Sequence, residues 1–85
     1  ACSMLTRASL YAEVGMWDLR VPLYWGDTDW CARVLRAGQR VCCAVDSRAW
    51  HRDWSSVVRG FGAATFIRDH VRGALLFHLR HDPLG

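Results

Sequence analysis

The sequence contains no lysine and no asparagine, and all eleven of its basic residues are arginine. Eight acidic residues bring the formal net charge to +3, and the two signs are interspersed along the chain. A modest and mixed charge does not by itself indicate a nucleic-acid partner. The arginine- and alanine-rich composition is typical of a bacterial genome rich in G and C.

The sequence also lacks any C-x-x-C pair, although it has four cysteines. Cys42 and Cys43 are adjacent, a spacing that suits neither a zinc site nor a disulfide framework. We therefore expect reduced cysteines that act as small buried hydrophobes, as in a cytoplasmic domain.

No stretch of about 18 consecutive apolar residues is present, so no segment is expected to span a membrane. No signal peptide is visible in the sequence, which starts without methionine, and residues 1–5 are expected to form the middle of a buried strand. A hydrophobic content of 52% fits a packed domain, but 85 residues is near the lower limit for a self-sufficient core. We expect a fragment of a larger protein.

The most informative stretch is residues 23–38, where an aromatic loop leads into an amphipathic helix. Asp27 is expected to be the N-cap, with Asp29 in the first turn, where the helix dipole favours negative charge. Gly38 is expected to end the helix in the left-handed conformation. The residues expected on its apolar face are Trp30, Val34 and Ala37, and those expected to point elsewhere are Arg33 and Arg36.

Shorter elements are expected on either side of this helix. Thr6 is expected to cap a brief helix over residues 8–14, which Gly15 ends. The run at residues 40–45 is bounded by a glycine and by Asp46-Ser47, and it predicts a buried strand. A second extended piece is expected at residues 49–51.

Residues from Trp54 onwards predict a longer amphipathic helix with a break near Gly60–Gly62, because glycine costs about 1 kcal/mol relative to alanine in a helix interior. The apolar residues are expected to form a stripe along one face of this helix, with the arginines mostly off that face. The residues of the stripe are Val57, Val58, Phe61, Ala64, Ile67, Val71, Leu75 and Leu79.

Three motifs occur in an order that resembles the family 2 glycosyltransferases. They are the turn at residues 14–18, the Asp27-Thr28-Asp29 helix and the strand at residues 46–51 that ends in histidine. The resemblance covers roughly residues 4 to 52 and implies an α/β fold, a partial GT-A fold of short strands and helices. On this interpretation residues 1–52 form the acceptor-side part of a GT-A catalytic domain, and residues 53–85 form a C-terminal helical extension.

The resemblance also implies the chemistry of an inverting transfer from a nucleotide-diphosphate sugar. Asp27 matches the general base that takes the proton of the acceptor hydroxyl, and Trp25 and Asp29 match acceptor-binding positions. His51 matches a ligand of the divalent metal, Mn or Mg, that stabilises the departing diphosphate. Arg52 could face the diphosphate, since guanidinium groups match phosphate oxygens.

Other interpretations stay open. Asp27 could be a simple helix cap, His51 a structural residue and Trp25 an ordinary packing residue. Gly26 departs from the family, many of whose members carry an acidic residue immediately before the base. The chain could instead be a small non-catalytic module that binds nucleic acid or a protein through arginine and tryptophan, or a degenerate transferase remnant.

The expected partners follow from the transferase interpretation. They are the sugar donor, an acceptor that is a glycan, a lipid or a peptide-derived molecule, and the missing N-terminal half of the same chain. The late apolar stripe could pack against that half or rest on an anionic membrane surface. We expect a cytoplasmic protein, with the inner face of the membrane as a further option, and no transferase activity from the isolated 85 residues.

Overall fold

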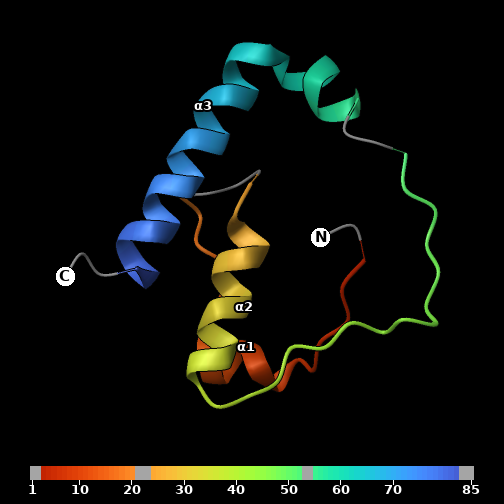
Figure 1. The fold of residues 1–85 in the computed structure, drawn as a ribbon, viewed down its shortest axis with the longest axis vertical. Coiled ribbons are helices and arrows are strands. Elements are labelled where there is room, and N and C mark those ends of the chain that lie inside the picture. The colour runs from red at the N-terminus through yellow and green to blue at the C-terminus, as the bar shows by residue number, and fades with distance from the viewer. Residues whose placement is uncertain (1–2, 21–23, 53–54, 83–85) are drawn as a thin grey trace.

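Helices joined by long irregular segments make up the chain in the computed structural model (Figure 1). The structure describes residues 3–20, 24–52 and 55–82. The helices are α1 (Ser9–Val14), α2 (Gly26–Arg36) and α3 (Ser55–His81). Within the described ranges the fold is all-helical and contains no strand.

The predicted α/β fold is therefore wrong. The predicted strand at residues 40–45 is irregular, and every residue from 40 to 50 is exposed, with Val45 85% exposed. The predicted extended piece at residues 49–51 is irregular as well. A strand needs a neighbour to satisfy its backbone groups, and among the described residues no segment pairs with this one. Instead it runs around the outside of the molecule between α2 and α3 (Figure 1).

A small core joins α1 to α2. Leu10, Trp30 and Val34 are buried, and the Tyr11 ring stacks on Trp30 with ring centroids 5.1 Å apart. The Trp30 indole N–H donates to the carbonyl of Gly15, 2.8 Å away, at the point where α1 ends. The predicted short helix and the predicted burial of Trp30 and Val34 are confirmed.

The C-terminal end of α2 also matches its prediction. Gly38 has a φ of 84°, a value that favours glycine because it has no Cβ. Its N–H donates to the carbonyl of Leu35, and the N–H of Gln39 donates to the carbonyl of Val34. This pair of hydrogen bonds is a Schellman motif, which satisfies carbonyls that the helix leaves without partners.

The predicted N-caps are wrong. Ala8 occupies the N-cap of α1 without a side-chain cap, and the Thr6 hydroxyl instead donates to the carbonyl of Arg7. Trp25 occupies the N-cap of α2, so Asp27 lies inside the first turn. The carbonyl of Trp25 accepts the first hydrogen bond of α2, from the N–H of Asp29, and the Asp27 side chain accepts from the N–H of Thr28 within the first turn.

The break predicted in the last helix is confirmed at Gly62, whose φ of 82° and ψ of 161° are not helical. Four aliphatic side chains of the predicted stripe lie on the surface of the described residues, each more than half exposed. They are Ile67, Val71, Leu75 and Leu79. The side chains of Val57, Val58 and Phe61 lie outside the described part of the chain. The buried strand expected at residues 1–5 is wrong at residues 3–5, which are irregular and exposed, and residues 1–2 lie outside the described ranges.

The residues of α3 that do pack inward include a glycine and charged groups. Gly73 and Asp69 are buried, and a Cβ at Gly73 would lie 2.8 Å from the carbonyl oxygen of Tyr24. The absence of that Cβ lets α3 approach the start of α2. Hydrophobic periodicity gives no sign of this contact.

The arrangement is more open than a closed domain of this length. Its radius of gyration is 14.4 Å, against about 12 Å expected for 85 residues. Large apolar side chains far from the core, including Leu5, Leu19 and Trp50, are more than 90% exposed. Much of the apolar surface is therefore available for contacts outside the described residues.

Candidate functional site

Asp27 lies in the first turn of α2, where its negative charge meets the positive end of the helix dipole. The backbone N–H of Thr28 donates to its Oδ1, 2.9 Å away. Burial acts to raise the pKa of Asp27, but hydrogen bonds to the carboxylate outweigh it, so the pKa lies below its usual value. The group is therefore ionised at neutral pH.

A pocket of about 410 Å³ lies between α2 and α3 and includes Asp27 in its wall. This volume is within the range of small-molecule sites. The lining is largely apolar and comes from one face of α2, from α3 and from the N-terminal segment. Its residues are Met4, Asp27, Thr28, Cys31, Ala32, Leu35 and Phe77.

Cys31 adds a thiol to the same wall. Burial raises its pKa, and the negative charge of Asp27 raises it further. A thiol with a raised pKa stays protonated and is a poor nucleophile at neutral pH. Asp27 is therefore the charged group among the residues that line the pocket.

Asp29 has a different environment, although it is only two residues away. It is 3% exposed, and the side chains of two arginines and one histidine converge on its carboxylate. Arg80 Nη1 donates to both oxygens at 2.8 Å, Arg33 Nε donates to Oδ2 at 3.2 Å, and His81 Nε2 lies 2.9 Å from Oδ1. Asp29 is thus fully engaged within the chain, an arrangement that favours a structural role over the predicted contact with an acceptor.

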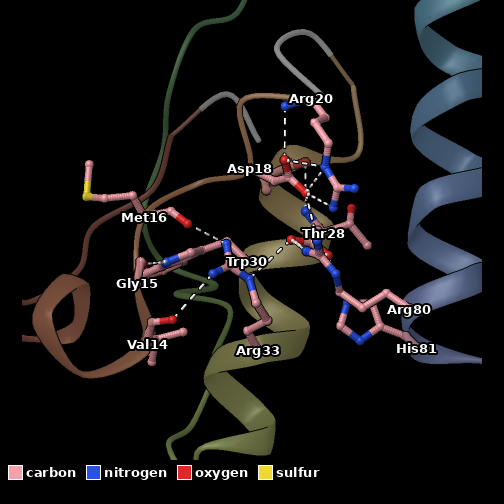
Figure 2. Close-up of polar contacts among 12 residues, drawn as sticks. Val14, Gly15, Met16, Asp18, Arg20, Thr28, Trp30, Arg33, Arg80 and His81 are labelled. Atoms are coloured by element: carbon pink, nitrogen blue, oxygen red, sulfur yellow. Dashed lines mark hydrogen bonds and ion pairs between the residues drawn. The ribbon is translucent and has the colours of Figure 1, made fainter.

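Arg80 extends this cluster to the loop that precedes α2 (Figure 2). Its Nη2 donates to Oδ2 of Asp18 at 2.8 Å, and Arg20 donates to both oxygens of the same carboxylate. Arg33, predicted to point away from the core, instead donates to the backbone carbonyls of Val14 and Met16. We call Asp18, Asp29, Arg33, Arg80 and His81 the ionic cluster.

The ionic cluster predicts a specific response to acid. Hydrogen bonds from Arg20 hold the pKa of Asp18 well below its ordinary value of 3.8. A carboxylate with a depressed pKa stabilises the fold above the unfolded-state pKa, and this contribution is lost as the pH falls from about 4 towards the lower folded-state pKa. We expect Asp18→Asn to flatten this part of the pH dependence, measured by urea unfolding at pH 7, 4, 3 and 2. An unchanged slope would contradict the assignment.

The Trp25 side chain packs against α3 and is not among the residues that line the pocket. Its φ of 70° is left-handed, a conformation that costs about 1–2 kcal/mol for a residue with a Cβ. Contacts with α3 offset this cost, with ring centroids 5.3 Å from Phe77, 5.7 Å from His78 and 6.0 Å from His70. The acceptor-binding role predicted for Trp25 has no support from this position.

His51 and Arg52 are exposed on the irregular segment before α3, and none of the described contacts joins either of them to Asp27. Across residues 3–20, 24–52 and 55–82, no three His, Cys, Asp or Glu side chains gather where they could hold a metal ion. The residues described do not fit a metal site around His51 by themselves.

Sequence reasoning missed several of the residues that the fold brings together in the ionic cluster and in the pocket. Asp18, Arg80 and His81 belong to the ionic cluster, and Phe77 contributes to the pocket. The one local signal was the spacing of Asp29 and Arg33, four residues apart on a helix. The other partners lie about 50 to 60 residues away in sequence, as the 51-residue separation of Arg80 from Asp29 illustrates.

Comparisons of the chain with protein-family models, with curated proteins and with solved structures give no match. In the part of the chain that the structure describes, no helix is both long enough and apolar enough to cross a bilayer.

Proposed function

We propose that Asp27 is the general base of a glycosyltransferase, of the family 2 type, that moves a sugar from a nucleotide-diphosphate donor to an acceptor hydroxyl. The observation that carries the proposal is the position of this carboxylate in the wall of the 410 Å³ pocket. It is ionised there, beside a surface that is otherwise largely apolar. The order of the sequence motifs around Asp27, which resembles that of family 2, is the reason for proposing glycosyl transfer as the specific reaction.

In the proposed reaction, the acceptor occupies the pocket with a hydroxyl directed at the Asp27 carboxylate. The carboxylate takes the proton as the hydroxyl oxygen attacks the anomeric carbon of the donor. The bond from that carbon to the diphosphate breaks, and the electron pair leaves with the diphosphate. Phe77 offers an aromatic surface in the same pocket, and such surfaces suit the C–H faces of sugar rings.

The all-helical fold adds no support of its own, since it is not the fold that the resemblance implies. The proposal therefore rests on the Asp27 site and assigns the donor and its metal to parts of a parent protein outside the described residues. His51 and Arg52 would join the donor site only through contacts with those parts. We place this parent protein in the cytoplasm, with a glycan, a lipid or a peptide-derived molecule as the acceptor.

The test incubates the intact parent protein with a panel of nucleotide-diphosphate sugars and measures sugar transfer through the release of nucleoside diphosphate. Asp27→Asn is expected to lower kcat by about 100- to 10,000-fold, the usual contribution of a general base. The substitution keeps the size of the side chain and removes only its basicity. Because the chain described lacks a donor site, the isolated 85 residues are expected to show no transfer.

The matched control is Asp46→Asn, which makes the same chemical change at an exposed position. It is expected to leave kcat within about twofold, since surface substitutions away from structural features have small effects. If Asp27→Asn and Asp46→Asn transfer sugar at equal rates, Asp27 is not the base. If the intact parent transfers no sugar from any donor in the panel, the remnant interpretation is favoured.

A second candidate function is binding of single-stranded nucleic acid by the segment around Trp50. The Trp50 side chain is 99% exposed, and Arg48 and Arg52 are exposed on either side of it. Exposed aromatic rings and arginines are what such binding uses. Affinity for a labelled oligo-dT that falls between 50 and 200 mM salt, and that Trp50→Ala removes, would favour this function. No binding at either salt concentration would exclude it.

A further inference from the structure

The outward surface of α3 carries a row of aliphatic side chains with nothing packed on them among the described residues. Ile67, Val71, Leu75 and Leu79 follow each other at intervals of four, and they are 59%, 51%, 59% and 70% exposed. We call these four residues the outer stripe. Figure 1 shows α3 along one edge of the molecule, where one side of the helix is accessible.

The opposite face of α3 is fixed in place. Gly73 contacts Trp25 with no room for a Cβ, and Arg80 and His81 hold the buried Asp29. Turning the outer stripe inward would break these ion pairs and leave Asp29 buried without its partners, which is costly. The stripe is therefore a permanent feature of the surface and not a face that the chain can bury by rotating the helix.

Positive charge lies beside the outer stripe. Arg68 and Arg72 are exposed on the same side of the helix, and the Arg68 side chain is 68% exposed. The acidic residues between Gly62 and Asp82 are Asp69, which is ion-paired with Arg68, and Asp82, which is ion-paired with His78. The stripe and its flank are thus apolar and cationic, with each of the nearby carboxylates already paired.

We propose that the outer stripe binds the surface of an anionic lipid membrane, with α3 lying in the interfacial plane. Apolar side chains enter the boundary between headgroups and acyl chains, while Arg68 and Arg72 meet the anionic headgroups. This binding does not depend on the proposed transferase activity. It does not require a membrane-spanning helix, which the described residues lack.

The spacing of the outer stripe argues against a second copy of α3 as its partner. Steps of four residues turn the row by about 40° each around the helix, so it drifts away from a straight seam. A two-stranded coiled coil needs apolar residues every 3.5 residues on average. Two such faces would also bring cationic flanks together, whereas anionic headgroups attract them.

The test is co-sedimentation of the full 85-residue chain with vesicles of phosphatidylcholine, alone or mixed 3:1 with phosphatidylglycerol. We expect at least tenfold stronger binding to the anionic vesicles, weakened by 0.5 M salt because screening acts on exposed charges. The double variant Val71→Ser, Leu75→Ser is expected to lose binding to both kinds of vesicle. Arg72→Gln is expected to lose part of the preference for anionic lipid.

The matched control is Leu19→Ser, at a leucine that is 91% exposed in the loop before α2. It is expected to bind vesicles as the unchanged chain does. Far-UV circular dichroism checks that each variant keeps its helices. We expect the helices to be kept, because the substituted residues are exposed. Equal binding by the double variant, equal loss in Leu19→Ser, or a dimer in sedimentation that the double variant abolishes would each overturn the proposal.

Discussion

Replacing Asp29 by asparagine is expected to lower the free energy of unfolding by about 3–5 kcal/mol, the usual cost of removing one partner from a buried ion pair. The carboxylate is 5% exposed and holds Arg33, Arg80 and His81. Without it, Arg33 loses this carboxylate partner and Arg80 keeps only Asp18. Because small domains are stable by only about 5–15 kcal/mol, this loss is a large fraction of the total, and the variant is expected to unfold at a markedly lower urea concentration. Urea unfolding followed by far-UV circular dichroism measures the change.

Asp46→Asn is the control for this experiment, since Asp46 is exposed in the segment after α2. Its effect is expected to stay within about 0.5 kcal/mol. A double-mutant cycle with Arg80→Gln should give a coupling energy of about 1–3 kcal/mol, as expected for residues in direct contact. Additive effects of Asp29→Asn and Arg80→Gln would contradict the assignment of Asp29 as the centre of the ionic cluster.

Gly73→Ala is expected to destabilise the chain by about 1–3 kcal/mol, the usual cost of forcing a methyl group into a packed contact. An added Cβ would lie 2.8 Å from the carbonyl oxygen of Tyr24 and 2.8 Å from Cδ1 of Trp25. Since one of these atoms belongs to the backbone, α3 has to move away from the start of α2. Urea unfolding of the variant measures the result.

The sign of this result is informative, because helix propensity alone predicts the opposite. Alanine is more favourable than glycine by about 1 kcal/mol in a helix interior, so Gly73→Ala would be stabilising if α3 were not packed at this point. The control is Ala64→Gly at an exposed position of α3. It should lose about 1 kcal/mol from propensity alone. A stabilising Gly73→Ala would contradict the observed contact.

Local signals in the sequence were enough to predict the helices. Gly15, Gly38 and Gly62 end or interrupt helices close to where the sequence indicated, because a positive φ requires a residue without a Cβ. The burial of Trp30 and Val34 follows from their spacing of four residues on α2. These predictions depend only on residues within a few positions of one another.

The predictions that failed depend on distant contacts. The hydrophobic pattern of α3 did not predict that its inward position is taken by Gly73 and by charged residues that find partners on other elements. A hydrophobic pattern cannot register a charged residue that is buried against an opposite charge. The strand predicted at residues 40–45 failed for a related reason, since an apolar run becomes a strand only beside another strand.

The candidate site was predicted in part. Asp27 was singled out from its motif, and the structure places it in the pocket wall. Its neighbours there, Cys31 and Leu35, share its face of α2 and follow from helical spacing, but Phe77 arrives from α3 and had no local signal. Asp29 resembled Asp27 in sequence, and its distant partners Arg80 and His81 distinguish the two carboxylates.

The ionic cluster also determines the order in which the chain can become stable during synthesis. Arg80 is 51 residues from Asp29 and 62 residues from Asp18 in sequence. While translation proceeds, both carboxylates emerge from the ribosome long before the arginine that joins them. Until α3 is almost complete, the α1–α2 half has only the local partners Arg20 and Arg33 for these carboxylates, and closing such long loops slows the final folding step.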